Sequence, residues 1–185
     1  MIKIFLLVAL VLVAEYPAGA QSKPSFAVDA TTGGGRGNGG EFFDRRIGGV
    51  RLAVSVSGSR DAKLGPYVEI AQDWLALGMG HKAICYESPR GGCIQPFPEL
   101  RGPELILGGL LRPTPRVELR AGGGGGAFQL SEGPRVRGVV GQADASVRVS
   151  DHIGVLLGTR YVVLPRYLGD RLWTMPWAFG LRLRW

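Results

Sequence analysis

The stretch Trp177-Ala-Phe-Gly-Leu-Arg-Leu-Arg-Trp185 decides the fold, because it alternates between two kinds of side chain. Its large apolar residues are Trp177, Phe179, Leu181, Leu183 and Trp185, and the residues between them are small or positively charged. Successive side chains of a β-strand point to opposite faces, so the stretch predicts a strand with one apolar and one basic face. In a soluble sheet the apolar face would pack into a core. In a membrane barrel it would meet lipid, and the arginines would point into the lumen.

Seven further segments show the same alternation with varying clarity, whereas helical periodicity is hard to find. The eight expected strands span residues 25–32, 47–57, 65–77, 104–111, 116–128, 136–149, 153–164 and 172–185. Segment 104–111 is nearly all apolar, so its facing stays open. The 30 glycines among 185 residues also argue against a soluble helical domain. Each Gly in a helix interior costs about 1 kcal/mol relative to Ala.

The connections between these strands alternate in length. They span residues 33–46, 58–64, 78–103, 112–115, 129–135, 150–152 and 165–171. A membrane barrel with both termini on the periplasmic side has short periplasmic turns and longer external loops. Here the short connections fall where turns are expected and the two longest fall where external loops are expected. A soluble sandwich has no reason to sort its loops in this way.

Residues 1–20 have the pattern of a secretory signal peptide. Lys3 gives a positive start, residues 4–14 are an unbroken apolar run, and Ala18-Gly19-Ala20 is a small-x-small cleavage pattern. The run is shorter than the roughly 20 residues that a membrane-spanning helix needs. We expect cleavage after residue 20, with an uncleaved helical anchor as the alternative. Residues 21–185 are then one barrel domain.

Export also decides how the cysteines are interpreted. Cys85 and Cys93 are the two cysteines of the chain, and turn-forming residues lie between them. In an oxidising compartment such a pair most simply forms a disulfide. Free thiols or a metal site are the alternatives, but even with His81 the ligands would number only three. We therefore expect a disulfide in the longest external loop, and no metal or other cofactor.

The last segment resembles the C-terminal signature of bacterial outer-membrane β-barrels, Gly180-x-x-Leu183-x-Trp185. With the signal peptide, the alternation and the sorted connections, the whole mature chain looks like the small OmpA-like and OmpX-like barrels. The resemblance implies an all-β, eight-stranded antiparallel up-and-down transmembrane β-barrel in the cell outer membrane of a diderm bacterium. It also implies that Gly180, Leu183 and Trp185 belong to a docking signal for the barrel-assembly machinery.

Two residues depart from this family pattern. Pro176 lies inside the last strand, where it removes a ladder donor and predicts a bulge or a late strand start. Arg137 falls on the expected lipid face, where a midplane Arg would cost about 2–4 kcal/mol, so it is expected near the outer rim. The aromatic girdles at the membrane interfaces are assigned to Trp74, Trp173, Trp185 and Tyr67.

The alternation assigns a set of charged side chains to the lumen. The basic members are Arg51, Arg120, Arg148, Arg160, Arg182 and Arg184. The acidic members are Glu69, Asp73, Glu104, Glu118 and Asp144. An eight-stranded barrel is just wide enough for its own side chains, and the planar guanidinium of Arg pairs well with carboxylates. We therefore expect a salt-bridged, closed lumen, and the alternative is a narrow ion pathway.

Other motifs carry weaker signals. Residues 33–40 resemble a glycine- and arginine-rich nucleic-acid segment, but their place after an export signal favours a flexible external loop and no nucleic-acid partner. The glycine run 122–126 lacks the Lys-Ser/Thr of a phosphate loop, and is interpreted as a strand end where large side chains need room. Lipid-A-modifying barrels of similar size use a catalytic His near a Ser. His81 and His152 fall in a loop and a turn, so we assign no catalytic residue and do not expect an enzyme.

The expected function is therefore that of a monomeric structural or adhesive surface protein that acts through its external loops. The formal net charge of +7 suits the phosphates of lipopolysaccharide at the barrel rim. A narrow channel or small-ligand carrier is the first alternative. The second is a secreted soluble barrel of lipocalin type, which would need an apolar lumen and a polar exterior.

Overall fold

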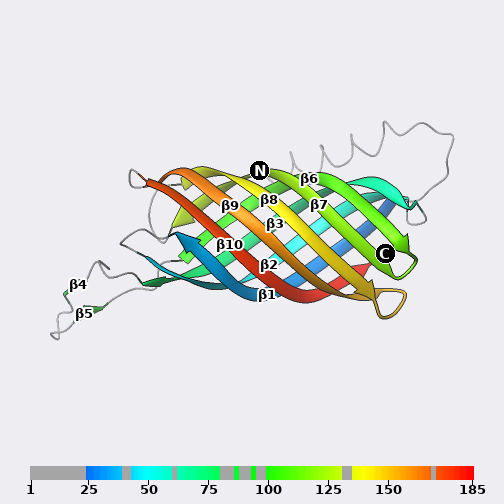
Figure 1. Ribbon diagram of the computed structural model, residues 1–185, viewed down its shortest axis with the longest axis horizontal. Coiled ribbons are helices and arrows are strands. Elements are labelled where there is room, and N and C mark those ends of the chain that lie inside the picture. The colour runs from blue at the N-terminus through cyan, green and yellow to red at the C-terminus, as the bar shows by residue number, and fades with distance from the viewer. Residues whose placement is uncertain are drawn as a thin grey trace.

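The computed structural model describes residues 24–38, 43–59, 62–79, 86–87, 93–94, 99–130, 135–167 and 170–185. These residues form a closed barrel and a separate two-stranded sheet (Figure 1). The barrel strands are β1 (Pro24–Asn38), β2 (Phe43–Ser59), β3 (Leu64–Met79), β6 (Glu99–Thr114), β7 (Val117–Leu130), β8 (Arg135–Arg148), β9 (Ile153–Tyr167) and β10 (Asp170–Arg184). The small sheet pairs β4 (Tyr86–Glu87) with β5 (Cys93–Ile94). The predicted eight-stranded barrel is confirmed.

Neighbouring barrel strands are antiparallel and consecutive, and β10 closes the barrel against β1. We call the end that holds the C-terminus and the short connections the turn end, and the opposite end the loop end. The turn end lies at the right in Figure 1, and β4 and β5 extend beyond the loop end at the left. No helix among the described residues is long and apolar enough to cross a membrane.

The strands carry an apolar outer face and a charged inner face. Along β10, Phe179 and Leu181 are more than half exposed, whereas Arg182 between Leu181 and Leu183 is fully buried. The same alternation settles the facing of segment 104–111. Leu105 and Leu107 point outward there, and Glu104 points inward. This arrangement is the reverse of what a soluble lipocalin-type barrel needs, so the exterior fits lipid rather than water.

The strands near the loop end are longer than the sequence predicted. β1 runs to Asn38 and β2 begins at Phe43, so most of the connection predicted at 33–46 is strand. Glycines 33, 34, 35 and 37 lie in β1 against β10, where a Cβ at Gly33 would come within 2.0 Å of the Trp177 carbonyl oxygen. The glycine run 122–126 likewise lies inside β7 and not at a strand end. Glycine has no side chain to show alternation, which is why the predicted strands are shorter than the observed ones.

Pro176 causes neither a bulge nor a late strand start, so that prediction is wrong. The pairs Thr174↔Val162 and Trp177↔Thr159 keep one register on both sides of it. The irregularity of this strand pair lies instead near its loop end, between Asp170 and Leu172. The proline ring is buried on the inner face, and its carbonyl oxygen accepts a hydrogen bond of 3.1 Å from the Thr159 hydroxyl.

Several predicted features lie outside the described residues. These are the signal peptide at residues 1–20, His81 and Cys85. The backbone of Cys93 belongs to β5, opposite Glu87. The signal peptide and the disulfide therefore stay predictions.

Candidate functional site

The charged side chains of the lumen form one connected series of ion pairs, which we call the charge ladder. Its members are Asp29, Arg51, Glu69, Asp73, Glu104, Arg112, Glu118, Arg120, Asp144, Arg160, Arg182 and Arg184. Each of them is at most 9% exposed. Inward-facing positions of all eight strands contribute, so the ladder ties the whole barrel wall together.

Arg182 is the centre of the ladder and is fully buried. Its Nε and Nη2 donate to the two carboxylate oxygens of Asp29 at 2.7 and 2.8 Å. Its Nη1 donates to Glu118 at 2.9 Å, and its Nη2 also approaches Asp144 at 3.1 Å. One guanidinium from β10 thus holds carboxylates from β1, β7 and β8, which uses the fork geometry that Arg provides and Lys does not.

Arg120 is the next arginine of the charge ladder toward the loop end. It donates to Asp29 at 2.7 Å and to Asp144 at 3.0 Å, and lies 3.2 Å from Glu69. The ring of Tyr67 lies 5.0 Å from its guanidinium carbon, a cation–π contact. Tyr67 is 2% exposed. The assignment of Tyr67 to an aromatic girdle is therefore wrong, since it shares the inward parity of Glu69.

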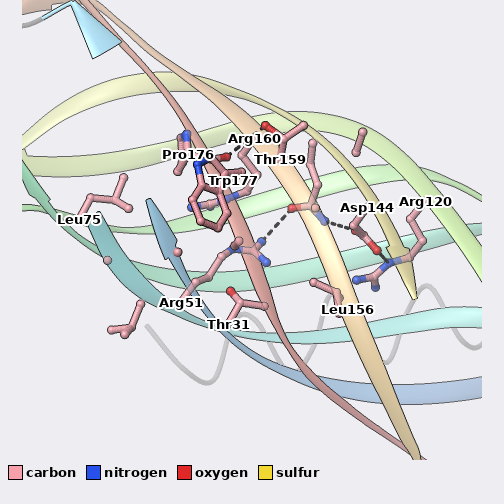
Figure 2. Close-up of a pocket in the computed structure, with 17 residues that line it drawn as sticks. Thr31, Arg51, Leu75, Arg120, Asp144, Leu156, Thr159, Arg160, Pro176 and Trp177 are labelled. Carbon is pink, nitrogen blue, oxygen red and sulfur yellow. Dashed lines mark hydrogen bonds and ion pairs between the residues drawn. The ribbon is translucent and has the colours of Figure 1, made fainter. Parts of the chain in front are cut away.

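The end of the ladder nearest the loop end is built around Arg51 and Arg160. Arg51 pairs with Glu69, and Arg160 pairs with Asp73 and, at 2.6 Å, with Glu104. Figure 2 shows Arg51, Arg120, Asp144 and Arg160 around a cavity of about 40 Å³. That volume holds a few water molecules and no larger ligand.

Glu118 is the carboxylate of the charge ladder that lies near the turn end. It accepts hydrogen bonds from Arg112 at 2.9 Å, Arg182 at 2.9 Å and Arg184 at 3.3 Å. Arg148 also lies here, half-buried, and its Nε is buried without a hydrogen-bond partner among the described residues. Basic groups therefore outnumber acidic ones at the turn end of the lumen.

The structure brings together ten of the eleven charged residues that the sequence assigned to the lumen and adds two charged residues that it missed. Asp29 pairs with two arginines, and Arg112 pairs with Glu118. Gln142 donates to Glu69 at 3.3 Å and to Asp144 at 3.0 Å. No group of three or more His, Cys, Asp or Glu side chains in the described part of the chain is arranged to hold a metal ion.

Toward the loop end, the lumen is filled by apolar side chains that we call the apolar plug. Its members are Leu75, Leu77, Leu100, Phe128, Val140, Val162, Leu164 and Leu172, each at most 6% exposed. Leu75 pairs with Leu100, and Leu164 with Leu172, across neighbouring strands. The plug lies between the charge ladder and the external connections, and the sequence analysis did not predict it.

The C-terminal signature lies at the seam where the barrel closes. The backbone amides of Trp185 and Phe26 each donate to the carbonyl of the other, at 3.0 and 3.2 Å. A Cβ at Gly180 would come within 2.0 Å of the Ala30 carbonyl oxygen, so the close approach of β1 requires glycine there. Leu183 faces outward. Whether Gly180, Leu183 and Trp185 are read by an assembly machinery stays a prediction.

Exposed arginines gather on the outer surface next to the loop end. These rim arginines are Arg36, Arg101, Arg135, Arg137 and Arg171. Arg101 and Arg135 both lie beside Gln129 in the sheet, and Arg137 is the third residue of β8, near the rim. Aromatic residues lie in the same zone, since Trp74 is opposite Arg101 and the rings of Tyr161 and Trp173 are 5.9 Å apart.

Comparisons with solved structures agree with this geometry. The structure of Ail, the attachment invasion locus protein of Yersinia pestis, in complex with the heparin analogue sucrose octasulfate, matches with a TM-score of 0.52 and 15% identity. The match covers 88% of this chain and 97% of Ail. The chain has the fold of the small outer-membrane barrels.

Two further structures support the same conclusion about the fold. Neisserial surface protein A matches with a TM-score of 0.51 and 13% identity over 86% of this chain and 96% of that one. The outer membrane protein Ail of Yersinia pestis in a phospholipid bilayer nanodisc matches with a TM-score of 0.51 and 13% identity. That match covers 89% of this chain and 100% of Ail. No protein-family model and no curated protein matches the sequence.

Proposed function

We propose that the protein is a closed, monomeric β-barrel of the outer membrane of a diderm bacterium, and that it anchors its external loops at the cell surface for a structural or adhesive role. The observation that carries this proposal is the apolar exterior around a filled lumen. Exposed side chains such as Leu107, Leu157 and Phe179 would be stable only against lipid.

The filled lumen argues against the channel alternative. Ions would have to pass the apolar plug, whose side chains offer no hydrogen bonds to replace their water. They would also have to separate buried ion pairs such as Arg182–Asp29, where removal of one partner leaves an uncompensated charge. The cavity beside Arg51, among the described residues, has a volume of only about 40 Å³, which is too small for a wide water-filled path at that level of the barrel. Activity is therefore expected on the external surface.

The rim arginines support a role for anionic surface partners. Lipopolysaccharide carries phosphates in the outer leaflet, at the depth where a girdle next to the external loops would lie. Arg101 and Arg135, on either side of Gln129, present two guanidiniums on one face. Arg binds phosphate in fork geometry. The structure of Ail with a heparin analogue is a precedent for anion binding by this fold, and we extend it to this chain as part of the proposal.

Membrane localisation and closure are tested together. The mature protein should fractionate with the outer membrane and migrate faster in detergent gels when it is not heated, because the folded barrel resists detergent. In planar bilayers the wild-type protein should give no stable conductance. The Arg182→Gln/Glu118→Gln double variant should also stay silent, since the apolar plug remains in place. A soluble protein, or a large stable wild-type conductance, would contradict the proposal.

The lipopolysaccharide contact is tested by thermal unfolding in bilayers with and without lipopolysaccharide. A ligand that binds the folded state raises the midpoint, so lipopolysaccharide should stabilise the wild type. The Arg101→Gln/Arg135→Gln/Arg137→Gln variant should lose this increase. The control Arg116→Gln, which removes an exposed arginine at the turn end, should keep it. An equal increase in both variants would rule out the rim arginines as the contact.

The adhesive role is tested with whole cells that display the protein. These cells should bind to surfaces coated with sulfated glycans. Binding should disappear when the connection between β3 and β6 is replaced by a short Gly-Ser linker. Unchanged binding would remove the adhesive part of the proposal and leave the structural part.

A further inference from the structure

The turn end of the lumen holds a basic cavity that the proposed function does not use. Its volume is about 540 Å³. Its lining combines residues from three short connections and their adjoining strands: Lys63, Arg112, Pro113, Thr114, Pro115, Arg148, Asp151 and His152. Lys63 comes from the β2–β3 connection, and His152 from the β8–β9 connection. The cavity faces the turn end, so it lies across the plug from the external loops.

The charge balance of this cavity favours an anion. Its lining has the basic groups of Lys63, Arg112 and Arg148 against the carboxylate of Asp151. The nearest carboxylate of the ladder, Glu118, is already shared by three arginines. Farther up the lumen the balance is different, because Arg51 and Arg160 lie among three carboxylates. Among the described residues at the turn end, basic side chains therefore outnumber acidic ones.

The hydrogen-bonding state of the lining points in the same direction. Arg148 has a buried Nε without a hydrogen-bond partner among the described residues. Arg148 also lines the cavity, so an oxyanion bound there would lie against its side chain. Arg112 is held in place by the Ala62 carbonyl at 3.1 Å and Glu118 at 2.9 Å. The His152 ring nitrogen Nδ1 lies 3.0 Å from the Arg184 carbonyl oxygen, which fixes the ring.

We propose that this cavity is a binding site for a phosphate group, with Arg148 and Lys63 as its principal donors. Phosphate suits the site because it accepts several hydrogen bonds at once and carries the charge that the cavity lacks. The phosphate can belong to a soluble phosphomonoester or to a lipid headgroup. Both present the same group to the site.

The test uses the mature protein folded in an uncharged detergent, titrated with inorganic phosphate at constant ionic strength and followed by calorimetry. A second titration uses dihexanoyl phosphatidic acid, a short-chain lipid phosphate. Wild-type protein should bind at least one of the two probes saturably. Loss of a charge-assisted hydrogen bond is worth about 1.5–3 kcal/mol, so Arg148→Gln should weaken binding by roughly tenfold or more. Lys63→Gln, which lies in an exposed connection, should weaken it less.

The control is Arg116→Gln, which removes the same charge from an exposed position at the turn end outside the cavity lining and should leave the affinity unchanged. Folding of every variant is checked by heat-modifiable migration, and Lys63→Gln provides an independent readout if Arg148→Gln does not fold. Binding of inorganic phosphate supports a soluble source, and binding of the lipid probe alone supports a headgroup. The proposal is overturned if neither probe binds the wild type. It is also overturned if Arg116→Gln weakens binding as much as the cavity variants do.

Discussion

The two halves of the lumen are filled by opposite chemistry on the same strands. Toward the turn end, inward positions carry charges such as Arg182 and Glu118, paired at 2.9 Å. Toward the loop end, the inward positions carry Leu100, Phe128 and Leu164, with no exposed surface or almost none. Side chains fill most of both halves, by ion pairing in one case and by apolar packing in the other.

The charged half and the apolar half of the lumen contribute differently to the fold. In the turn half, a slip of one residue would turn Arg182 and Arg184 toward lipid and Leu183 toward the lumen. An Arg near the bilayer midplane costs about 2–4 kcal/mol, so the charges select one register. In parts of the loop half both strand faces are apolar, as at Val162 and Val163, and a slip there is penalised less. The charge ladder therefore specifies the register, and the apolar plug supplies the seal and the packing energy.

The largest expected effect comes from breaking the centre of the charge ladder. Arg182→Met should lower the free energy of unfolding by about 3–5 kcal/mol, because it leaves the carboxylates of Asp29, Asp144 and Glu118 buried without their shared partner. The measurement is reversible urea unfolding in lipid vesicles. Arg137→Met, an exposed position, is the control and should change little. A loss below 1 kcal/mol for Arg182→Met would mean that the ladder does not hold the turn half together.

Truncation of the plug should have a smaller but clear effect. Leu164→Ala removes buried methyl groups and leaves a cavity beside Phe128, which predicts a loss of about 2–3 kcal/mol. Leu157, on the same strand, is 61% exposed and faces outward. Leu157→Ala is the control and should cost less, because lipid fills the space. Equal losses from the two variants would show that the loop half is loosely packed and does not seal the barrel.

The sequence predicted the turn half well because charge and apolar residues alternate there. At Leu181–Arg184 the leucines face outward and the arginines face the lumen, as the alternation predicted. Asp29 follows the same rule, since it has the opposite parity to the apolar Phe26 and Val28 of the first expected strand. Arg112 was not assigned to the lumen because the expected strand ends at residue 111, one position before it.

The loop half was not predictable from alternation. Val162, Val163 and Leu164 are apolar in succession, so their pattern does not tell the lumen from the lipid face. Glycines 33, 34, 35 and 37 have no side chains to alternate. The ion-pair partners were also beyond the sequence. Arg182 on β10 meets Glu118 on β7 across the lumen, a contact that depends on the stagger of every strand between them.

The glycine run of β7 offers a finer test of packing in the turn half. A Cβ at Gly122 would lie 2.7 Å from the Tyr67 hydroxyl and 2.6 Å from the Leu107 carbonyl oxygen, whereas a Cβ at Gly123 would meet nothing closer than 3.5 Å. Gly122→Ala should therefore cost about 1–3 kcal/mol through overpacking. Gly123→Ala, on the outer face, should be neutral or slightly stabilising. The same urea unfolding experiment compares them, and a neutral Gly122→Ala would mean that Tyr67 moves freely.

The smallest expected effect is the response of the charge ladder to salt. Raising the salt concentration from 0.1 to 1 M shortens the Debye length from about 10 Å to about 3 Å, which weakens exposed ion pairs strongly and buried ones much less. Since Arg182 is fully buried, the cost of Arg182→Met should change by less than about 0.5 kcal/mol over this range. Comparing the variant with the wild type at each salt concentration removes the general effect of salt on unfolding. A cost that falls by half at high salt would mean that ions reach the ladder past the plug or from the turn end. In that case the ladder would line an aqueous path, and the distinction between a charged half and a sealed half would fail.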